Sequence, residues 1–273
     1  MGGFEGARLG ENYVNNVQEK IDLTIQNIFN IGNTNKNLHY IKGDIAEPWH
    51  AGTTQIYAAA KGINNIEIDV PRDTSPIDIR AYSPTEYLNA QLKYFKTPEA
   101  TCKAISNPKY DGLIKIVPSD QLEDIRHIAY DLYLKNLHTR PVMAQQYLDT
   151  YNSATERLNI GNAHGTPLSE HEALQIAKEI QKDNFNPDHH ELNTLNYIQA
   201  SDIFRESGEA AFNAAILSAV LTASPHLFKA FKALITDGEF DISELKNAGS
   251  AAASGATQGA LRGGISAAIV SSC

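Results

Sequence analysis

Cysteine and long apolar runs are scarce in this 273-residue chain. The two cysteines, Cys102 and Cys273, exclude a disulfide framework and a four-cysteine metal site, so we expect a reducing, cytoplasmic setting. No stretch reaches 18 uninterrupted apolar residues, and the first residues lack the basic and apolar segments of a signal peptide. An ordinary membrane span and a signal-directed secreted protein are therefore not expected, whereas export by another route stays open.

A surplus of basic residues is also missing. The chain has 23 Lys and Arg against 32 Asp and Glu, a formal net charge of −9. No global positive field attracts nucleic acid or acidic lipid, although a local basic groove is compatible with an acidic protein. At 42% hydrophobic residues, the chain has enough apolar side chains for a sizeable core.

Several common catalytic motifs do not occur. The pairs His171-Glu172 and His190-Glu191 lack the HExxH spacing that places two imidazoles one helical turn apart, so a zinc protease is not expected. No Gly-Lys-Ser/Thr loop and no GxSxG elbow is present. Cys102 lies among alanines in a helical pattern, which is typical of a buried structural thiol.

The first half of the chain alternates between helix and strand patterns. Spacing of apolar residues predicts helices over 12–29 and 44–61, then strands over 65–70, 77–82 and 90–95, a short helix over 98–106, a strand over 112–117 and a helix over 119–137. The short links between the first three strands indicate an antiparallel meander, and the helix before the fourth indicates a crossover to a parallel position. We therefore expect an α+β fold in which helices flank a small mixed sheet.

From residue 139 onward the pattern predicts helices only. This suggests three regions: an N-terminal helix and linker over 1–40, the sheet-bearing core over 41–138, and an all-helical domain over 139–273. In the last region, residues 210–223 are apolar on nearly all sides, and Gly255, Gly259 and Gly263 recur every four residues. These features predict a homo-oligomer or a protein partner that packs on residues 197–273.

Four polar residues in the expected core favour one chemistry. Glu47 falls near the start of the helix before the sheet, Asp78 lies between two isoleucines, and Gln91 and Lys93 share one face of the third strand. Carboxylate and amide oxygens suit a hard divalent cation, and a nearby ammonium helps to orient an attacking water and to offset phosphate charge. The alternative is that Asp78 and Lys93 form a cross-strand ion pair on a solvated face, with Gln91 a surface residue.

On these residues and this element order, the chain over about 41–137 resembles the PD-(D/E)xK nuclease superfamily, and it is also similar to uncharacterised bacterial and mobile-element proteins. The resemblance implies a restriction-endonuclease-like αβββαβ core with Mg²⁺ or Mn²⁺ as cofactor. It implies that Asp78, Gln91 and Glu47 hold the metal and that Lys93 lies near the attacking water. Gln91 stands where the superfamily motif has an acid, and Ile77 rather than proline precedes Asp78.

Three basic residues could contact substrate phosphates near this site. His50 follows Glu47 by about one helical turn, and Arg80 and Lys96 fall on or near the expected sheet. The alternative places Arg80 and Lys96 among solvated charges at strand ends, with His50 on the helix surface beside Trp49 in the core.

The sequence thus predicts a Mg²⁺-dependent nuclease that hydrolyses DNA phosphodiester bonds, with RNA as an open alternative and bacterial or phage conflict as a setting suggested by the resemblance. A second hypothesis is a non-catalytic nuclease-fold protein that assembles through its helical half. A third is a membrane-active effector that uses the glycine-repeat segment within 250–273. The Arg262, Gln258 and serine content of that segment argues against a membrane role.

Overall fold

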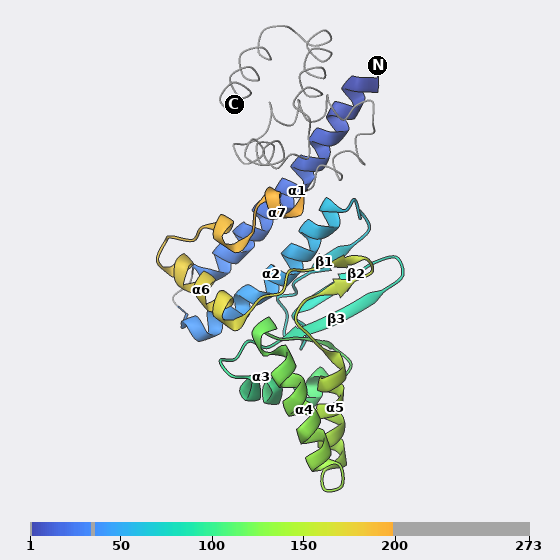
Figure 1. Ribbon diagram of the computed structural model, residues 1–273, viewed down its shortest axis with the longest axis vertical. Helices are drawn as coiled ribbons and strands as arrows, with labels where there is room; N and C mark the ends of the chain where they lie inside the picture. The colour runs from blue at the N-terminus through green and yellow to red at the C-terminus, as the bar shows by residue number, and fades with distance from the viewer. Residues whose placement is uncertain (1, 34–35, 199–273) are drawn as a thin grey trace, which may run out of the picture. The chain divides into compact units, whose positions relative to one another are not determined.

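The computed structural model describes residues 2–33 and 36–198, which form a mixed α+β protein (Figure 1). The chain divides into two compact units, of which residues 20–58 and 63–190 form the one that contains the sheets. We call it the sheet unit. The expectations for the apolar helix at 210–223 and for the glycine repeat near 260 concern residues outside those that the structure describes.

Two long helices open the chain. Helix α1 spans Gly2–Gly32 and α2 spans Leu38–Ala60, so both expected helices are present and both begin earlier than predicted. Asn37 caps α2, because its side-chain oxygen accepts the His39 N–H at 3.0 Å. Glu47 and Pro48 therefore lie in the interior of α2. The expectation that Glu47 falls near the start of this helix is wrong.

Helix α1 packs closely against α2 and against Ile180 at two glycines. A side chain added at Gly52 would meet Thr24 of α1 at 2.3 Å, and one at Gly32 would meet Ile180 at 2.5 Å. Trp49 is 1% exposed, and its indole N–H donates to the Thr166 carbonyl at 3.0 Å. The expectation that Trp49 anchors the core is confirmed.

The main sheet has five strands in the order β1-β2-β3-β4-β5. Strands β1 (Glu67–Asp69), β2 (Ile79–Tyr82) and β3 (Tyr87–Leu92) form the predicted antiparallel meander, with Ile79 opposite Ala90. Strand β4 (Ile114–Ile116) pairs parallel to β3 after the crossover through α3 (Pro98–Ile105) and the 3₁₀ turn η1 (Pro108–Tyr110), which confirms the mixed sheet.

A helical hairpin makes a second crossover. The 3₁₀ turn η2 (Ser119–Gln121) leads into α4 (Leu122–Asn136) and α5 (Pro141–Ser153), and β5 (Ala154–Thr155) then pairs parallel to β4. Figure 1 shows the hairpin extending away from the sheet. Residues of α4 and of the elements beneath the hairpin are almost fully buried and form one apolar cluster: Cys102, Ile105, Val117, Leu122, Ile125, Ala129 and Ala154.

Strand β5 shows that the expectation of helices only beyond residue 139 is wrong. A second correction is the two-stranded sheet of β6 (Asn159–Ile160) and β7 (Ala163–His164). Strands of two residues are too short to display the alternation by which a sequence reveals a strand. Helix α6 (Glu170–Gln181) follows, with Ser169 as its N-cap, and then η3 (Pro187–His190).

The second unit contains few of the described residues. Its part of α1 is joined to the end of α2 by a hydrogen bond from the Tyr13 hydroxyl to the Ala60 carbonyl at 2.8 Å. Helix α7 (Thr194–Tyr197) is capped by Asn193, whose side chain accepts from the Asn196 N–H. Across residues 2–33 and 36–198, no helix has the length and apolar character that crossing a membrane requires.

Candidate active site

Asp78 and Gln91 meet where β2 begins and β3 ends. Asp78 directly precedes β2, and the antiparallel register that pairs Ile79 with Ala90 brings Asp78 beside Gln91. One carboxylate oxygen of Asp78 accepts the side-chain amide of Gln91 and, at 2.9 Å, the backbone N–H of Leu92. The hairpin ladder thus fixes the aspartate with two donors.

Gln91 is a buried donor and not a surface residue. It is 2% exposed, and its amide nitrogen also donates to the Leu92 carbonyl at 3.1 Å. Because both of these bonds use the nitrogen, the amide oxygen is the atom that remains to act as a ligand. The alternative that Gln91 is a surface polar residue is therefore wrong.

Glu47 faces the same aspartate from α2. Its side chain is 17% exposed and accepts a hydrogen bond from the Arg72 guanidinium at 3.0 Å. Burial first, and then the negative charge of Asp78, raise the pKa of Glu47 to about 7, while Arg72 and Lys93 oppose the rise. Glu47, Asp78 and Lys93 are thus brought within electrostatic range of one another.

Asp78 also has an elevated pKa. Burial is the main cause, the hydrogen bond from the Leu92 N–H and the charge of Lys93 oppose it, and the charge of Asp44 adds to it. No direct ion pair joins Asp78 to Lys93, although both lie in the described part of the chain. A simple cross-strand salt bridge therefore does not account for these two residues.

Sequence reasoning missed two charged neighbours of the site. Asp44 lies three residues before Glu47 on α2, a spacing that places both on one face, and its charge raises the pKa of Glu47. That spacing could have identified it. Arg72 lies in the loop after β1, and no motif or periodicity marked it.

Lys93 follows the last residue of β3. Its backbone N–H donates to the Ile116 carbonyl of the neighbouring β4 at 3.2 Å, which extends the parallel pairing by one residue. Its ammonium lies 5.2 Å from the ring centroid of Tyr110, within the range of a cation–π interaction.

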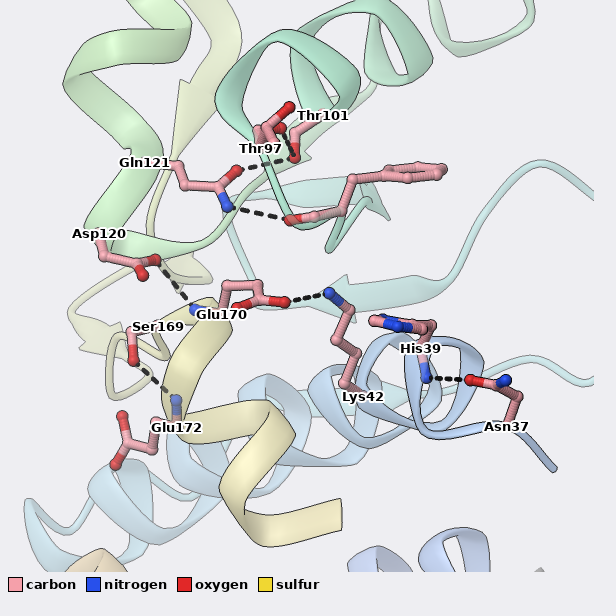
Figure 2. Close-up of polar contacts among 11 residues, drawn as sticks. Asn37, His39, Lys42, Thr97, Thr101, Asp120, Gln121, Ser169, Glu170 and Glu172 are labelled. Carbon is pink, nitrogen blue, oxygen red and sulfur yellow. Dashed lines mark hydrogen bonds and ion pairs between the residues drawn. The ribbon is translucent and has the colours of Figure 1, made fainter. Parts of the chain in front are cut away.

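The segment that follows β3 is linked by hydrogen bonds to three other elements (Figure 2). The Gln121 amide donates to the Phe95 carbonyl at 2.9 Å and accepts from the Thr101 hydroxyl at 2.8 Å. The turn that contains Gln121 is tied to α6, because the Asp120 carboxylate accepts the Glu170 N–H at 2.9 Å. These bonds hold the segment that carries Lys93.

A buried ion pair closes this network. The ammonium of Lys42 on α2 binds the carboxylate of Glu170 on α6, with side chains 2% and 14% exposed (Figure 2). The pair thereby joins α2, which carries Glu47, to α6. The turn after β4 is bonded to α6 as well. Lys42 and Glu170 therefore affect the candidate site by positioning α2 and not by contacting the site residues.

His50 is not placed to contact a phosphate. It is entirely buried, which lowers its pKa to about 3 and keeps the ring neutral. Its Nε2 lies 2.8 Å from the Tyr94 hydroxyl, which itself donates to the Leu168 carbonyl at 3.2 Å. Since the single hydroxyl proton goes to Leu168, Nε2 must carry the proton of the ring. This corrects both sequence interpretations of His50, as a phosphate contact and as a helix-surface residue.

Arg80 and Lys96 differ in how free they are to bind a substrate. Arg80 pairs with Asp73 at 3.0 Å and lies 3.9 Å from Asp69, so its charge is already neutralised. Lys96 is exposed just beyond the end of β3. Of the three expected phosphate contacts, Lys96 is the one that the structure leaves accessible.

Glu47 and Asp78 are the two carboxylates of the candidate site that could bind a divalent cation. In the described part of the chain, no three His, Cys, Asp or Glu side chains are grouped as a metal centre of acidic, histidine or cysteine ligands would need. Mg²⁺ is commonly bound through one or two carboxylates and several waters. Burial and then the charge of Asp78 raise the pKa of Glu47, and a bound cation would favour the ionised carboxylate.

Comparison with known proteins adds no relative to this picture: no protein-family model, curated protein or solved structure matches the chain.

Proposed function

We propose that the protein is a Mg²⁺-dependent nuclease whose site consists of Glu47, Asp78, Gln91 and Lys93. The observation that carries this proposal is that Glu47, on α2, is electrostatically coupled both to Asp78 beside β2 and to Lys93 beside β3. Burial of two like charges in one place costs stability, so such an arrangement favours a functional site over a structural one. The order α2, β1, β2, β3, α3, β4 supports the nuclease resemblance.

In this proposal, Asp78 and Glu47 bind the metal through carboxylate oxygens, and the Gln91 amide oxygen is a third, neutral ligand. The bound cation would polarise the scissile phosphate and lower the pKa of a water molecule. The ammonium of Lys93 neutralises charge on the phosphate and orients the attacking water. Lys96 contacts a neighbouring phosphate, since it is exposed beyond the same strand.

The test is cleavage of plasmid, single-stranded DNA and RNA with Mg²⁺ or Mn²⁺, using the wild-type chain beside Asp78→Asn and Lys93→Met. Both variants retain size and should fold. We expect Asp78→Asn to lose metal binding and cleavage together, and Lys93→Met to bind metal normally but cleave roughly a hundredfold or more slowly. Arg80→Met is the matched control, because its charge is paired away from the site. Equal cleavage by all four proteins contradicts the proposal.

A second candidate is a non-catalytic protein with the same core. The observation in its favour is that Gln91 donates to Asp78 and Arg72 pairs with Glu47, so both carboxylates already have positively polarised partners. In that case no divalent cation binds, and Asp78→Asn is at least as stable as the wild type. Isothermal titration with Mn²⁺ separates the two candidates without reference to any substrate.

A further inference from the structure

A local excess of positive charge follows the candidate site along the chain. Residues 93–110 contain one acidic residue, Glu99, and four lysines, although the whole chain has a net charge of −9: Lys93, Lys96, Lys103 and Lys109. None of these lysines forms an ion pair with a described residue. They therefore supply beside the site the positive potential that the chain as a whole lacks.

Two of these lysines meet at one aromatic ring. The ammonium of Lys93 lies 5.2 Å from the ring centroid of Tyr110, and the ammonium of Lys109 lies 4.8 Å from it. Tyr110 is 4% exposed, so its ring is fixed by burial, and the 3₁₀ turn η1 holds Lys109 beside it. The two ammonium groups are within about 10 Å of each other, close to one Debye length at moderate salt, so their positive potentials add.

Phe95 is an exposed aromatic residue that follows Lys93 by two positions, and it is 45% exposed. Tyr94, which lies between them, is buried and bonded to His50. Because side chains alternate along a strand and the Lys93 N–H continues the pairing with β4, Lys93 and Phe95 both face away from the core that Tyr94 occupies. The Phe95 carbonyl accepts from the Gln121 amide at 2.9 Å, which holds the backbone beneath the ring.

An exposed ring among cations fits one class of ligand. A single strand of nucleic acid presents base faces that stack on aromatic side chains and phosphates that pair with lysines, and proteins that bind such strands combine the two features. In a duplex the base faces are covered by the neighbouring base pairs, so a protein ring cannot stack on them. A free phosphate or an acidic peptide would use the lysines and not the ring.

The neutral groups beside Phe95 favour DNA over RNA. The Gln121 amide uses its nitrogen on the Phe95 carbonyl and its oxygen on the Thr101 hydroxyl. The hydroxyl oxygen of Thr97 accepts the Ala100 N–H as the cap of α3. A protein distinguishes RNA from DNA by polar groups that bond to the ribose 2′-hydroxyl. These polar side chains are already engaged within the protein, which favours a strand without that hydroxyl.

We propose that Phe95, Lys96 and Lys109 bind a single strand of DNA beside the scissile phosphate. Phe95 stacks on a base, and Lys96 and Lys109 pair with neighbouring phosphates. The inference rests on the proposed nuclease, because it names the substrate of that same site. The site residues act on the reacting phosphate, whereas these three residues select a strand that is not base-paired.

Fluorescence anisotropy in EDTA measures this binding without cleavage. The probes are a labelled oligodeoxyuridylate of about twelve nucleotides, its duplex with oligodeoxyadenylate, and the oligouridylate that differs from it only by the 2′-hydroxyls. We expect the wild-type full chain to bind the DNA single strand roughly tenfold more tightly than the duplex, since only the single strand can stack on Phe95. The RNA strand should bind several-fold more weakly, because its 2′-hydroxyls lack free partners.

Phe95→Leu separates stacking from apolar contact. It should weaken single-strand binding roughly fivefold to hundredfold and leave duplex binding unchanged, whereas Phe95→Trp should retain the wild-type affinity. Tyr130→Leu is the matched control, since Tyr130 is 43% exposed and lies on α4. Circular dichroism establishes that the variants are folded.

The salt dependence of binding tests the phosphate contact. Lys109→Met should weaken single-strand binding and reduce the slope of log affinity against log salt by about 0.7, as loss of one phosphate contact does. Lys135→Met, at an exposed lysine near the end of α4, should leave the slope unchanged.

The outcomes separate this inference from the proposed function. Duplex binding as tight as single-strand binding, or wild-type affinity in Phe95→Leu, overturns the inference, and RNA bound as tightly as DNA overturns the choice of DNA. A chain that binds the single strand through Phe95 and Lys109 but cleaves no substrate with Mg²⁺ or Mn²⁺ contradicts the nuclease and supports the binding site. A chain that cleaves but fails the binding tests contradicts the binding site alone.

Discussion

The side-chain amide of Gln91 donates a hydrogen bond to the carboxylate of Asp78. A glutamate at that position could only accept, and it would place a second negative charge against the aspartate. Gln91 therefore adds no negative charge beside Asp78 when metal is absent. When a cation binds, its amide oxygen is a weaker, neutral ligand. In the proposed nuclease, this single amide sets the balance between stability without metal and affinity for metal.

Gln91→Glu should reverse that balance. Loss of a donor to a buried carboxylate and addition of a like charge should destabilise the metal-free protein by about 1–3 kcal/mol. Mg²⁺ affinity should rise at the same time, because the third carboxylate strengthens the donor set. Urea unfolding in EDTA and in excess Mg²⁺ measures both effects. A variant that Mg²⁺ stabilises no more than the wild type would show that this position does not face a metal.

Glu47 makes stability depend on pH. Its pKa lies near 7 in the folded protein against an ordinary value of 4.5, so the folded state holds an extra proton between these values. The resulting stability is fully present below about pH 4.5 and is lost as the pH rises through 7, by roughly 2–4 kcal/mol. Glu47→Gln should therefore be more stable than the wild type at pH 8 and equally stable near pH 4.

The same proton competes with the cation. Wild-type Mn²⁺ affinity should rise up to tenfold per pH unit below pH 7 and level off above it, because the ionised carboxylate is the ligand. In Glu47→Gln the affinity should be low and less dependent on pH over that range. A wild-type affinity that does not change between pH 5 and 7 would exclude Glu47 as a ligand.

Arg72 opposes metal binding from the loop after β1. Its guanidinium lowers the pKa of Glu47 and occupies one of its oxygens at 3.0 Å. Arg72→Ala should raise the pKa of Glu47 further, and at a pH above this raised value it should increase Mn²⁺ affinity several-fold, because the ionised carboxylate is then free of its guanidinium partner. The Arg72 side chain is 61% exposed, so the change in stability should stay within about 1 kcal/mol. Arg80→Ala, which removes a pair away from the site, is the control for nonspecific charge effects.

The buried pair of Lys42 and Glu170 should be far more sensitive to change than these surface charges. Glu170→Ala leaves an unpaired ammonium in the core and should cost about 3–5 kcal/mol. Lys42→Met with Glu170→Leu removes both charges and should recover most of that loss. Urea midpoints of the two variants, compared with that of Arg80→Ala at an exposed pair, measure the effect. A single substitution that is as mild as the control would contradict the burial of this pair.

The parts of the fold that the sequence predicts are those with a repeating pattern. Alternation identified β1, β2 and β3, and 3.6-residue spacing identified α1 and α2, although Asn37 shows that the true start of α2 was marked by a cap and not by an apolar residue. Strand β5 could not be predicted, because two residues are too few to show an alternating pattern. Its pairing to β4 depends on where the chain leaves the α4–α5 hairpin.

The candidate site shows the same division. Asp78, Gln91 and Lys93 could be grouped because strand alternation and hairpin pairing are regular. Arg72 could not, since the path of a loop is set by contacts distant in sequence. His50 was misplaced for another reason: helical spacing relates it to Glu47 but does not show that Tyr94, which follows three intervening strands, forms a hydrogen bond with its ring.

The Lys42–Glu170 pair also constrains the way the protein acquires its structure. Its partners are separated by 128 residues, and the first of them lies on the helix that carries Glu47. Contacts of such long range form slowly, because a large loop must close before they contribute. During synthesis, α2 and the β1–β3 meander leave the ribosome well before Glu170 has been made. The ammonium of Lys42 is therefore solvated by water until then. The candidate site is thus completed late, when nearly the whole sheet unit has been made, and a chain interrupted before α6 would carry all four site residues without the frame that aligns them.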